Sequence, residues 1–191
     1  MKRNLLLLGC LLSLSMLTFG QNKKRDLTKL YIPGSAVLRV SEKDQAVKLD
    51  YKQLGAPLPG FAIFNHENTE ITKNVLATGG NILVMMFNPT CDHCEDQTIL
   101  FGKNDSLFKK SKVLLVAAPM QIANMGYFEA NVGFSKYAAT MTVAVDSVKL
   151  IERLFNYIAL PQINIYDGKT HRLLKTYNGL QPLDSLRGYI Q

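Results

Sequence analysis

The stretch Asn81–Cys94, NILVMMFNPTCDHC, decides the fold of this 191-residue chain. Residues 81–87 form a continuous apolar run behind the pair Gly79-Gly80, a pattern typical of a strand buried on both faces of a sheet. Asn88-Pro89-Thr90 breaks the run, and residues 92–101 then follow as a predicted helix that opens on acidic residues. Two cysteines therefore lie where a buried strand passes into a helix.

The same alternation of short apolar runs and helix-like segments continues along the chain. Further strands are predicted at 61–64, 112–118, 140–145, 162–166 and 173–177, and further helices at 121–132, 147–156 and 183–190. Gly102 is expected to bend or end the first helix, and Asp167-Gly168 to turn the last two strands into a hairpin. Buried strands that alternate with helices indicate the α/β class, and the hairpin makes the sheet a mixed one.

The first twenty residues resemble a secretory signal. Lys2 and Arg3 precede an apolar run over 5–17, and Thr18-Phe19-Gly20 offers a cleavage site before Gln21. A retained membrane anchor is the alternative, although a bilayer span takes about 20 apolar residues. Leu7-Leu8-Gly9-Cys10 resembles a lipid-attachment box, but Cys10 lies inside the run rather than at its end.

We therefore expect an exported protein, located in the periplasm, and membrane-anchored if the N-terminal segment is retained or lipidated. The predicted organisation is a signal peptide over 1–20, an N-terminal extension over 21–54 and one domain over 55–191. The extension contains possible short strands at 37–40 and 46–49. The net charge of +7 is scattered and forms no basic stripe, so we expect no nucleic-acid partner.

The cysteines are informative because they are few. Three occur in the chain, and Cys10 would leave with the signal. Cys91 and Cys94 remain, two residues apart, and a disulfide between them would constrain the unfolded chain very little. A secreted scaffold stapled by disulfides carries more cysteines at wider spacing. Stapling therefore explains this pair poorly, and redox chemistry explains it well.

The position of the pair supplies a mechanism. The first turn of a helix has free N–H groups and a partial positive charge, both of which favour a thiolate. A second thiol one turn later can then attack the mixed disulfide and release the product. Thr90 is the expected N-cap residue. Between the cysteines, a protonated His93 would favour the thiolate and Asp92 would oppose it, which leaves the redox direction open.

Other interpretations of the pair require more than these residues provide. A structural zinc site needs four ligands, and Cys91, Cys94 and His93 on one helical turn give three at best, with His66 and His171 as distant candidates. A copper-delivery site usually has three residues between its cysteines. An inert surface disulfide would gain little stability.

The chain resembles the thioredoxin superfamily, and within it the exported TlpA-like, redoxin-type thiol–disulfide oxidoreductases, over residues 55–190. The matching segments are the opening GAPLPGF at 55–61, the strand and CxxC at 83–94, the segment LPQINIYDG at 160–168, and Gly179. The resemblance implies a three-layer α/β/α sandwich around a mixed sheet.

The resemblance also implies roles. Cys91 would be the attacking cysteine and Cys94 the resolving one, and Pro161 a cis-proline facing them, with the Leu160 backbone pairing with substrate. The redox-active Cys91–Cys94 disulfide would be the sole redox centre, with no cofactor and no metal. Protein thiols and disulfides of the exported compartment would be substrates, and a membrane or periplasmic redox protein the partner.

The chain departs from the family at positions that handle protons. Met85 stands where thioredoxins have a buried acid, and Gln97 where the TlpA-like branch often has a glutamate. Phe87 and Thr90 replace the tryptophans near the motif, and the chain has no Trp at all. Non-catalytic alternatives are a binding module or metallochaperone on this scaffold. A peroxiredoxin-like peroxidase shares the opening motif, but Pro89-Thr90-Cys91 lacks the spacing of a peroxidatic site.

Overall fold

The computed structural model describes residues 49–190 except 72–75, 77–78 and 148. The predicted signal, the possible strand at 37–40 and most of that at 46–49 lie outside these residues, and Leu49 itself is exposed and outside any strand. The proposed domain boundaries stay predictions.

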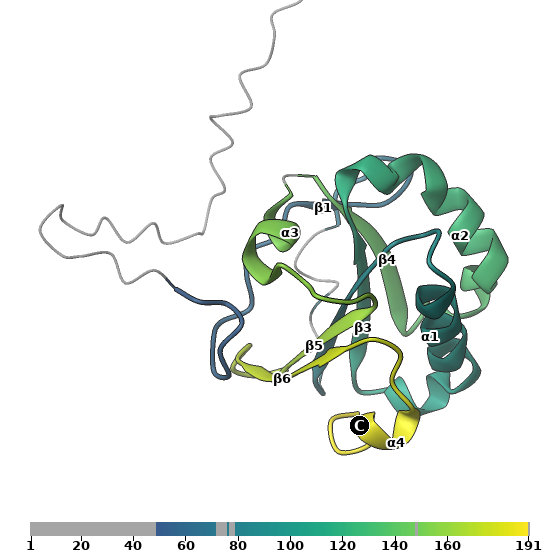
Figure 1. Cartoon of the computed structure of the whole chain (residues 1–191). Helices are drawn as coiled ribbons and strands as arrows, with labels where there is room; N and C mark the ends of the chain where they lie inside the picture. The colour runs from purple at the N-terminus through teal and green to yellow at the C-terminus, as the bar shows by residue number, and fades with distance from the viewer. Residues whose placement is uncertain (1–48, 72–75, 77–78, 148, 191) are drawn as a thin grey trace, which may run out of the picture. The chain divides into compact units, whose positions relative to one another are not determined.

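The described strands form one sheet in the order β1-β4-β3-β2-β5-β6 (Figure 1). The strands are β1 Ile63–Phe64, β2 Ile82–Phe87, β3 Lys112–Ala117, β4 Met141–Asp146, β5 Gln162–Tyr166 and β6 Leu173–Asn178. The helices are α1 Asp92–Lys103, α2 Met125–Val132, α3 Leu150–Phe155 and α4 Leu183–Leu186. β2, β3 and β4 are parallel, whereas β5 pairs antiparallel with β2, β6 with β5 and β1 with β4. The predicted mixed α/β sheet is confirmed.

Two apolar clusters lie on opposite faces of this sheet because successive side chains of a strand point to opposite sides. In β2, Leu83, Met85 and Phe87 join side chains of α1, α2 and α4 in one cluster. Ile82, Val84 and Met86 join side chains of α3 in the other. The arrangement of the helices in Figure 1 agrees with these clusters, and the predicted three-layer sandwich is confirmed.

Several predicted helix boundaries are wrong. Residues 121–132 divide into the end of a 3₁₀ segment, Pro119–Asn124, and α2. The helix predicted at 147–156 shrinks to α3 because Lys149 and Asn156, with φ of 55° and 43°, have left-handed backbone at its two ends. The helix predicted at 183–190 ends at Leu186.

Gly102 lies within α1, one residue before its last residue, Lys103. The residue is buried, and a Cβ placed on it would lie 2.4 Å from the Tyr137 ring. The glycine is therefore explained by the close approach of an aromatic ring rather than by backbone freedom.

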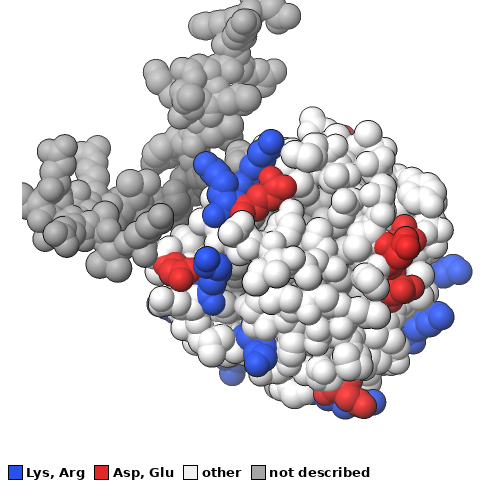
Figure 2. Space-filling view, viewed as in Figure 1, with Lys and Arg blue, Asp and Glu red and all other residues white. Residues whose placement is uncertain are grey.

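Acidic and basic side chains are interspersed on the face shown in Figure 2, around a broad uncharged area. No helix within residues 49–190, as far as these are described, is long and apolar enough to cross a membrane.

Candidate redox site

The CxxC lies at the junction between β2 and α1, at the carboxyl end of the central parallel strands. After β2 ends at Phe87, the Cys91 N–H donates to the Asn88 carbonyl at 3.1 Å and so forms a tight turn. The Cys91 carbonyl then accepts from the N–H groups of Cys94, at 2.8 Å, and Glu95, at 3.1 Å. Cys91 is therefore the N-cap residue itself, with extended backbone at φ −104° and ψ 115°.

The prediction that Thr90 caps the helix is wrong. Thr90 is exposed, and both its backbone N–H and its hydroxyl donate to the Asn88 side-chain oxygen, each at 3.0 Å. The Asn88 side chain thereby holds Thr90 in the turn before the helix, and the N-cap is Cys91, one residue later than predicted. Thr90 supports the turn but makes no capping bond to the helix.

The two thiols have different environments. Cys91 is half-buried at the rim of the apolar cluster, whereas Cys94 is completely buried within it. Burial raises the pKa of the Cys94 thiol strongly, and its hydrogen bond with Cys91 raises that pKa further. The Asn88 backbone N–H, hydrogen-bonded to the Cys94 sulfur, works in the opposite direction. This geometry leaves the outer thiol accessible and keeps the inner one protonated until a base removes its proton.

The charged neighbours of the pair lie mainly toward solvent. Asp92 and His93 are exposed, on the outer side of the first helical turn. Glu95 is half-buried, and its carboxylate accepts a hydrogen bond from the Asn131 side chain of α2. Its negative charge adds to the rise in the pKa of Cys94. Asn131 thus fixes the acid that acts on the inner thiol.

Leu160 and Pro161 lie at the same end of the sheet as the CxxC. Met86 of β2 pairs with Gln162 of β5, so the residues one step farther along, Phe87 and Pro161, lie at the same level. The Leu160–Pro161 peptide bond is cis, as the resemblance implies. Pro161 is buried and Leu160 is half-buried against both apolar clusters.

Gln97 has a structural role that the sequence did not reveal. The side chain is fully buried in α1, and its amide nitrogen donates to the Gln181 carbonyl at 3.2 Å. Its amide oxygen accepts from the Gln181 N–H at 2.7 Å. Two residues earlier, the Gly179 N–H donates to the Pro161 carbonyl at 2.8 Å. One amide thus ties the CxxC helix to the loop that holds the cis-proline.

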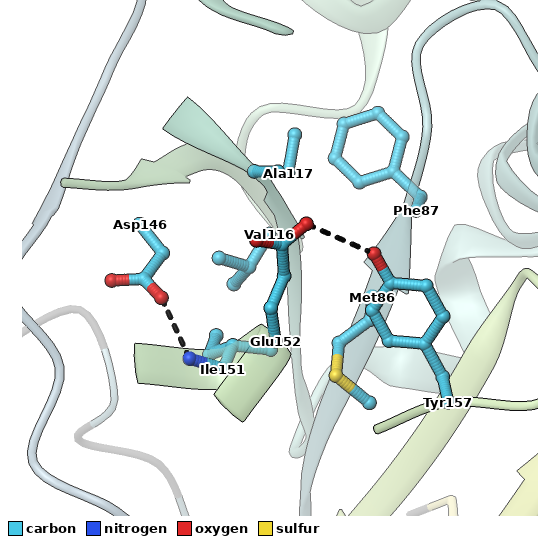
Figure 3. Close-up of a pocket in the computed structure, with 9 residues that line it drawn as sticks. Met86, Phe87, Val116, Ala117, Asp146, Ile151, Glu152 and Tyr157 are labelled. Atoms are coloured by element: carbon cyan, nitrogen blue, oxygen red, sulfur yellow. Dashed lines mark hydrogen bonds between the residues drawn. The ribbon is translucent and has the colours of Figure 1, made fainter. Parts of the chain in front are cut away.

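Met85, at the other departure from the family pattern, is completely buried among apolar side chains. Sequence reasoning also passed over Glu152 and Tyr157, which are hydrogen-bonded to each other at 3.4 Å (Figure 3), with Tyr157 packed against the apolar cluster on the other face of the sheet. Their only signal in the sequence was a place shortly before Pro161. Among the described residues, no group of three or more His, Cys, Asp or Glu side chains is arranged to hold a metal ion.

Searches with the sequence found no matching protein family and no matching curated protein. Comparison of the structure with solved structures found many matches. The chain has a thioredoxin-like fold. The thioredoxin domain of a thiol-disulfide oxidoreductase from Bacteroides vulgatus matches with a TM-score of 0.55 and 16% identity, over 71% of this chain and 94% of that one.

Two other matches are proteins of Mycobacterium tuberculosis and Bacillus subtilis. A secreted disulfide oxidoreductase of Mycobacterium tuberculosis, homologous to DsbE of E. coli, has a TM-score of 0.51 and 16% identity, with 68% of this chain and 92% of that chain covered. StoA of Bacillus subtilis has a TM-score of 0.51 and 17% identity, with 69% and 97% covered. The thioredoxin-like fold that the resemblance implies is thus confirmed.

Proposed function

We propose that the protein is a thiol–disulfide oxidoreductase and that Cys91 and Cys94 are its redox pair. The observation that carries the proposal is the asymmetry of the two thiols. One is accessible at the N-terminus of a helix, and its hydrogen-bonded neighbour is buried one turn later. This is the arrangement that a two-step exchange requires, because one thiol must meet the substrate and the other must reach only the intermediate.

In the reducing direction, the Cys91 thiolate attacks a substrate disulfide, and one substrate sulfur leaves as a thiolate. Cys94 loses its proton and attacks Cys91 in the mixed disulfide, which releases the second substrate thiol. The substrate disulfide gains two electrons, and the protein dithiol becomes the Cys91–Cys94 disulfide. The reverse sequence would oxidise a substrate dithiol. The pair needs no further cofactor for either direction.

The proposed substrates are protein thiols and disulfides outside the cytoplasm. The signal-like N-terminus supports export to the periplasm, and the Mycobacterium tuberculosis relative is described as secreted. The Leu160 backbone, next to the cis-proline, would pair with the substrate chain. A membrane or periplasmic redox protein would return the pair to its working state.

The test is reduction of insulin disulfides by the full chain with dithiothreitol as electron donor. We expect activity in the parent protein, none above background in Cys91→Ala, and a persistent mixed disulfide in Cys94→Ala. Cys10→Ala is the matched cysteine control and should retain full activity. Unchanged insulin reduction in Cys91→Ala would refute the proposal. Stoichiometric copper or zinc in the same preparation would favour the metallochaperone alternative.

A further inference from the structure

One edge of the sheet is only partly covered. β4 pairs with β3 along Met141–Val145, but on its other side β1 pairs only with the last two residues of β4. After Phe64 the chain turns back in a tight turn over residues 65–69. Among the residues that the structure describes, no strand therefore pairs with the outer side of Met141–Val143.

The backbone groups of Val143 point to this uncovered side. Directly before β4, the Thr140 carbonyl accepts from the Val113 N–H of β3 at 3.2 Å. Successive residues of a strand direct their N–H and C=O groups to opposite sides, so the even-numbered residues of β4 face β3 and the odd-numbered ones face the open edge. The Met141 N–H already donates to the Tyr137 carbonyl at 3.1 Å. The edge therefore offers the N–H and C=O of Val143 and the C=O of Met141.

A groove of about 440 Å³ lies against this edge. Met141–Val143 of β4 contribute to its lining, and each face of the sheet borders it with a half-buried apolar side chain. Phe134 belongs to the cluster on the α2 side of the sheet, and Ile71 to the cluster on the α3 side. The side chains of an added strand would alternate between these two walls. This edge groove thus combines the open backbone and the apolar walls that strand addition uses.

The lining of the edge groove is also acidic. Glu67 and Glu70 lie in the segment that turns back after β1, and Glu129 lies in α2. The Glu129 carboxylate is paired with His66 at 3.0 Å, which leaves the exposed Glu67 and Glu70 to attract a partner. No lysine or arginine is among the described residues that line the groove. Since the chain as a whole carries a net charge of +7, the groove is opposite in charge to the rest of the protein.

We propose that the edge groove binds an extended, basic segment of a partner protein, which adds a short strand to β4. The Val143 N–H donates to a carbonyl of this segment, and the Val143 carbonyl accepts from one of its N–H groups. Apolar side chains of the segment contact Phe134 and Ile71. Lysine or arginine side chains at its ends meet the exposed glutamates. The backbone hydrogen bonds supply affinity, and the charges select the partner.

The edge groove lies away from the redox pair. Through β3, Met141 is level with Leu83, near the start of β2, whereas the CxxC follows the end of β2. A partner bound in the groove would leave Cys91 open to a substrate. The inference therefore goes beyond thiol exchange and does not depend on it.

The experiment measures the binding of short peptides to the reduced full chain by fluorescence anisotropy. The probe is the fluorescein-labelled peptide KVTVTVK, whose β-branched residues favour an extended strand and whose ends are basic. Three control peptides each lack one feature of the probe. EVTVTVE reverses the end charges, KVTPTVK loses a backbone N–H to proline, and KGSGSGK keeps the charges without the strand-forming residues.

We expect KVTVTVK to bind about tenfold or more tightly than each control, because strand addition needs both the backbone and the side-chain contacts. The double variant Glu67→Gln, Glu70→Gln should bind the probe about fivefold more weakly, as the loss of two exposed ion pairs implies. The matched control Asp96→Asn, Asp184→Asn removes the same charge from exposed positions on other elements and should bind like the parent.

Hydrogen exchange observed by NMR locates the bound peptide. Saturation with KVTVTVK should slow exchange of the Val143 amide, which faces the groove. The amides of Thr142 and Ala144, which face β3, should change little. This pattern distinguishes pairing at the β4 edge from binding elsewhere on the protein.

Three results would overturn the inference. Equal binding of KVTVTVK and KGSGSGK would show charge attraction without strand addition. Equal binding of the probe by the parent and by Glu67→Gln, Glu70→Gln would exclude the acidic groove as its site. Unchanged exchange at Val143, or no binding at millimolar peptide, would refute the site altogether. Cys91→Ala should bind the probe like the parent, so a failure here and a failure of insulin reduction are told apart.

Discussion

Replacement of Gln97 by glutamate would restore an acid that the TlpA-like branch often carries, yet we expect it to destabilise this protein. Gln97 uses both ends of its amide, donating to the Gln181 carbonyl at 3.2 Å and accepting from the Gln181 N–H at 2.7 Å. A carboxylate accepts but does not donate. In Gln97→Glu, one oxygen would keep its bond to the N–H, while the other would face the Gln181 carbonyl oxygen from a fully buried position.

Two costs set the lower and upper limits of the expected loss in the free energy of unfolding. A buried carbonyl that loses its donor costs about 1 kcal/mol or more in the free energy of unfolding. A protonated glutamic acid could keep both hydrogen bonds, and holding a carboxyl of ordinary pKa 4.3 protonated at pH 7 costs about 3.7 kcal/mol. We therefore expect Gln97→Glu to lose about 1–4 kcal/mol at pH 7, with the introduced carboxyl raised in pKa by burial and by the facing carbonyl.

The raised pKa of the introduced carboxyl determines how the stability of the variant changes with pH. With a folded pKa above the unfolded value, the variant should approach parent stability below about pH 4. The difference should then grow as pH rises through the folded pKa. Urea denaturation of the reduced proteins from pH 4 to 8 measures it. Gln53→Glu, an exposed position, introduces the same charge and should show no such trend. A pH-independent difference, or a variant more stable than the parent at pH 7, would refute the role assigned to this amide.

Three further outcomes follow from the packing and from the buried thiol. Gly102→Ala should lose about 1–3 kcal/mol in urea denaturation, since a Cβ would lie 2.4 Å from the Tyr137 ring, whereas Gly60→Ala, with open space around it, should not. Gly168→Ala should lose at least as much, because its Cβ would lie 1.7 Å from a backbone oxygen of Gly80, and an unchanged midpoint would contradict that contact. The raised pKa of Cys94 predicts that the reduced protein is stabilised fully below the unfolded thiol pKa of about 8.5 and loses stability as pH rises above it. Thermal melts of the reduced and oxidised forms test this, and equal losses in both would count against it.

The architecture of the sheet could be predicted because its signals are local. The apolar run 81–87, the second run at 112–118 and the Asp167-Gly168 turn identify strands without knowledge of the rest of the fold. Helix ends were harder to predict because they depend on backbone conformations that no side-chain pattern marks. The left-handed Lys149 and Asn156 shorten α3 at both ends, and neither is a glycine.

Within the site, the location of the two thiols could be predicted from the sequence, whereas the hydrogen bonds of the turn that holds them could not. The spacing of Cys91 and Cys94 and the buried strand before them identify the pair from the sequence. The N-cap assigned to Thr90 was wrong because the neighbouring residue Asn88 binds its polar groups. The Thr90 hydroxyl and backbone N–H both donate to the Asn88 side-chain oxygen. A propensity for capping does not show which neighbour a hydroxyl will meet.

The two missing acids show most clearly where reasoning from sequence alone reaches its limit. When the sequence alone is compared with the family pattern, Gln97 marks the loss of an acid that handles protons. The structure shows a gain, since the amide bonds to both the carbonyl and the N–H of Gln181, 84 residues away, whereas an ionised glutamate could only accept. That position is committed to holding the loop beside Pro161.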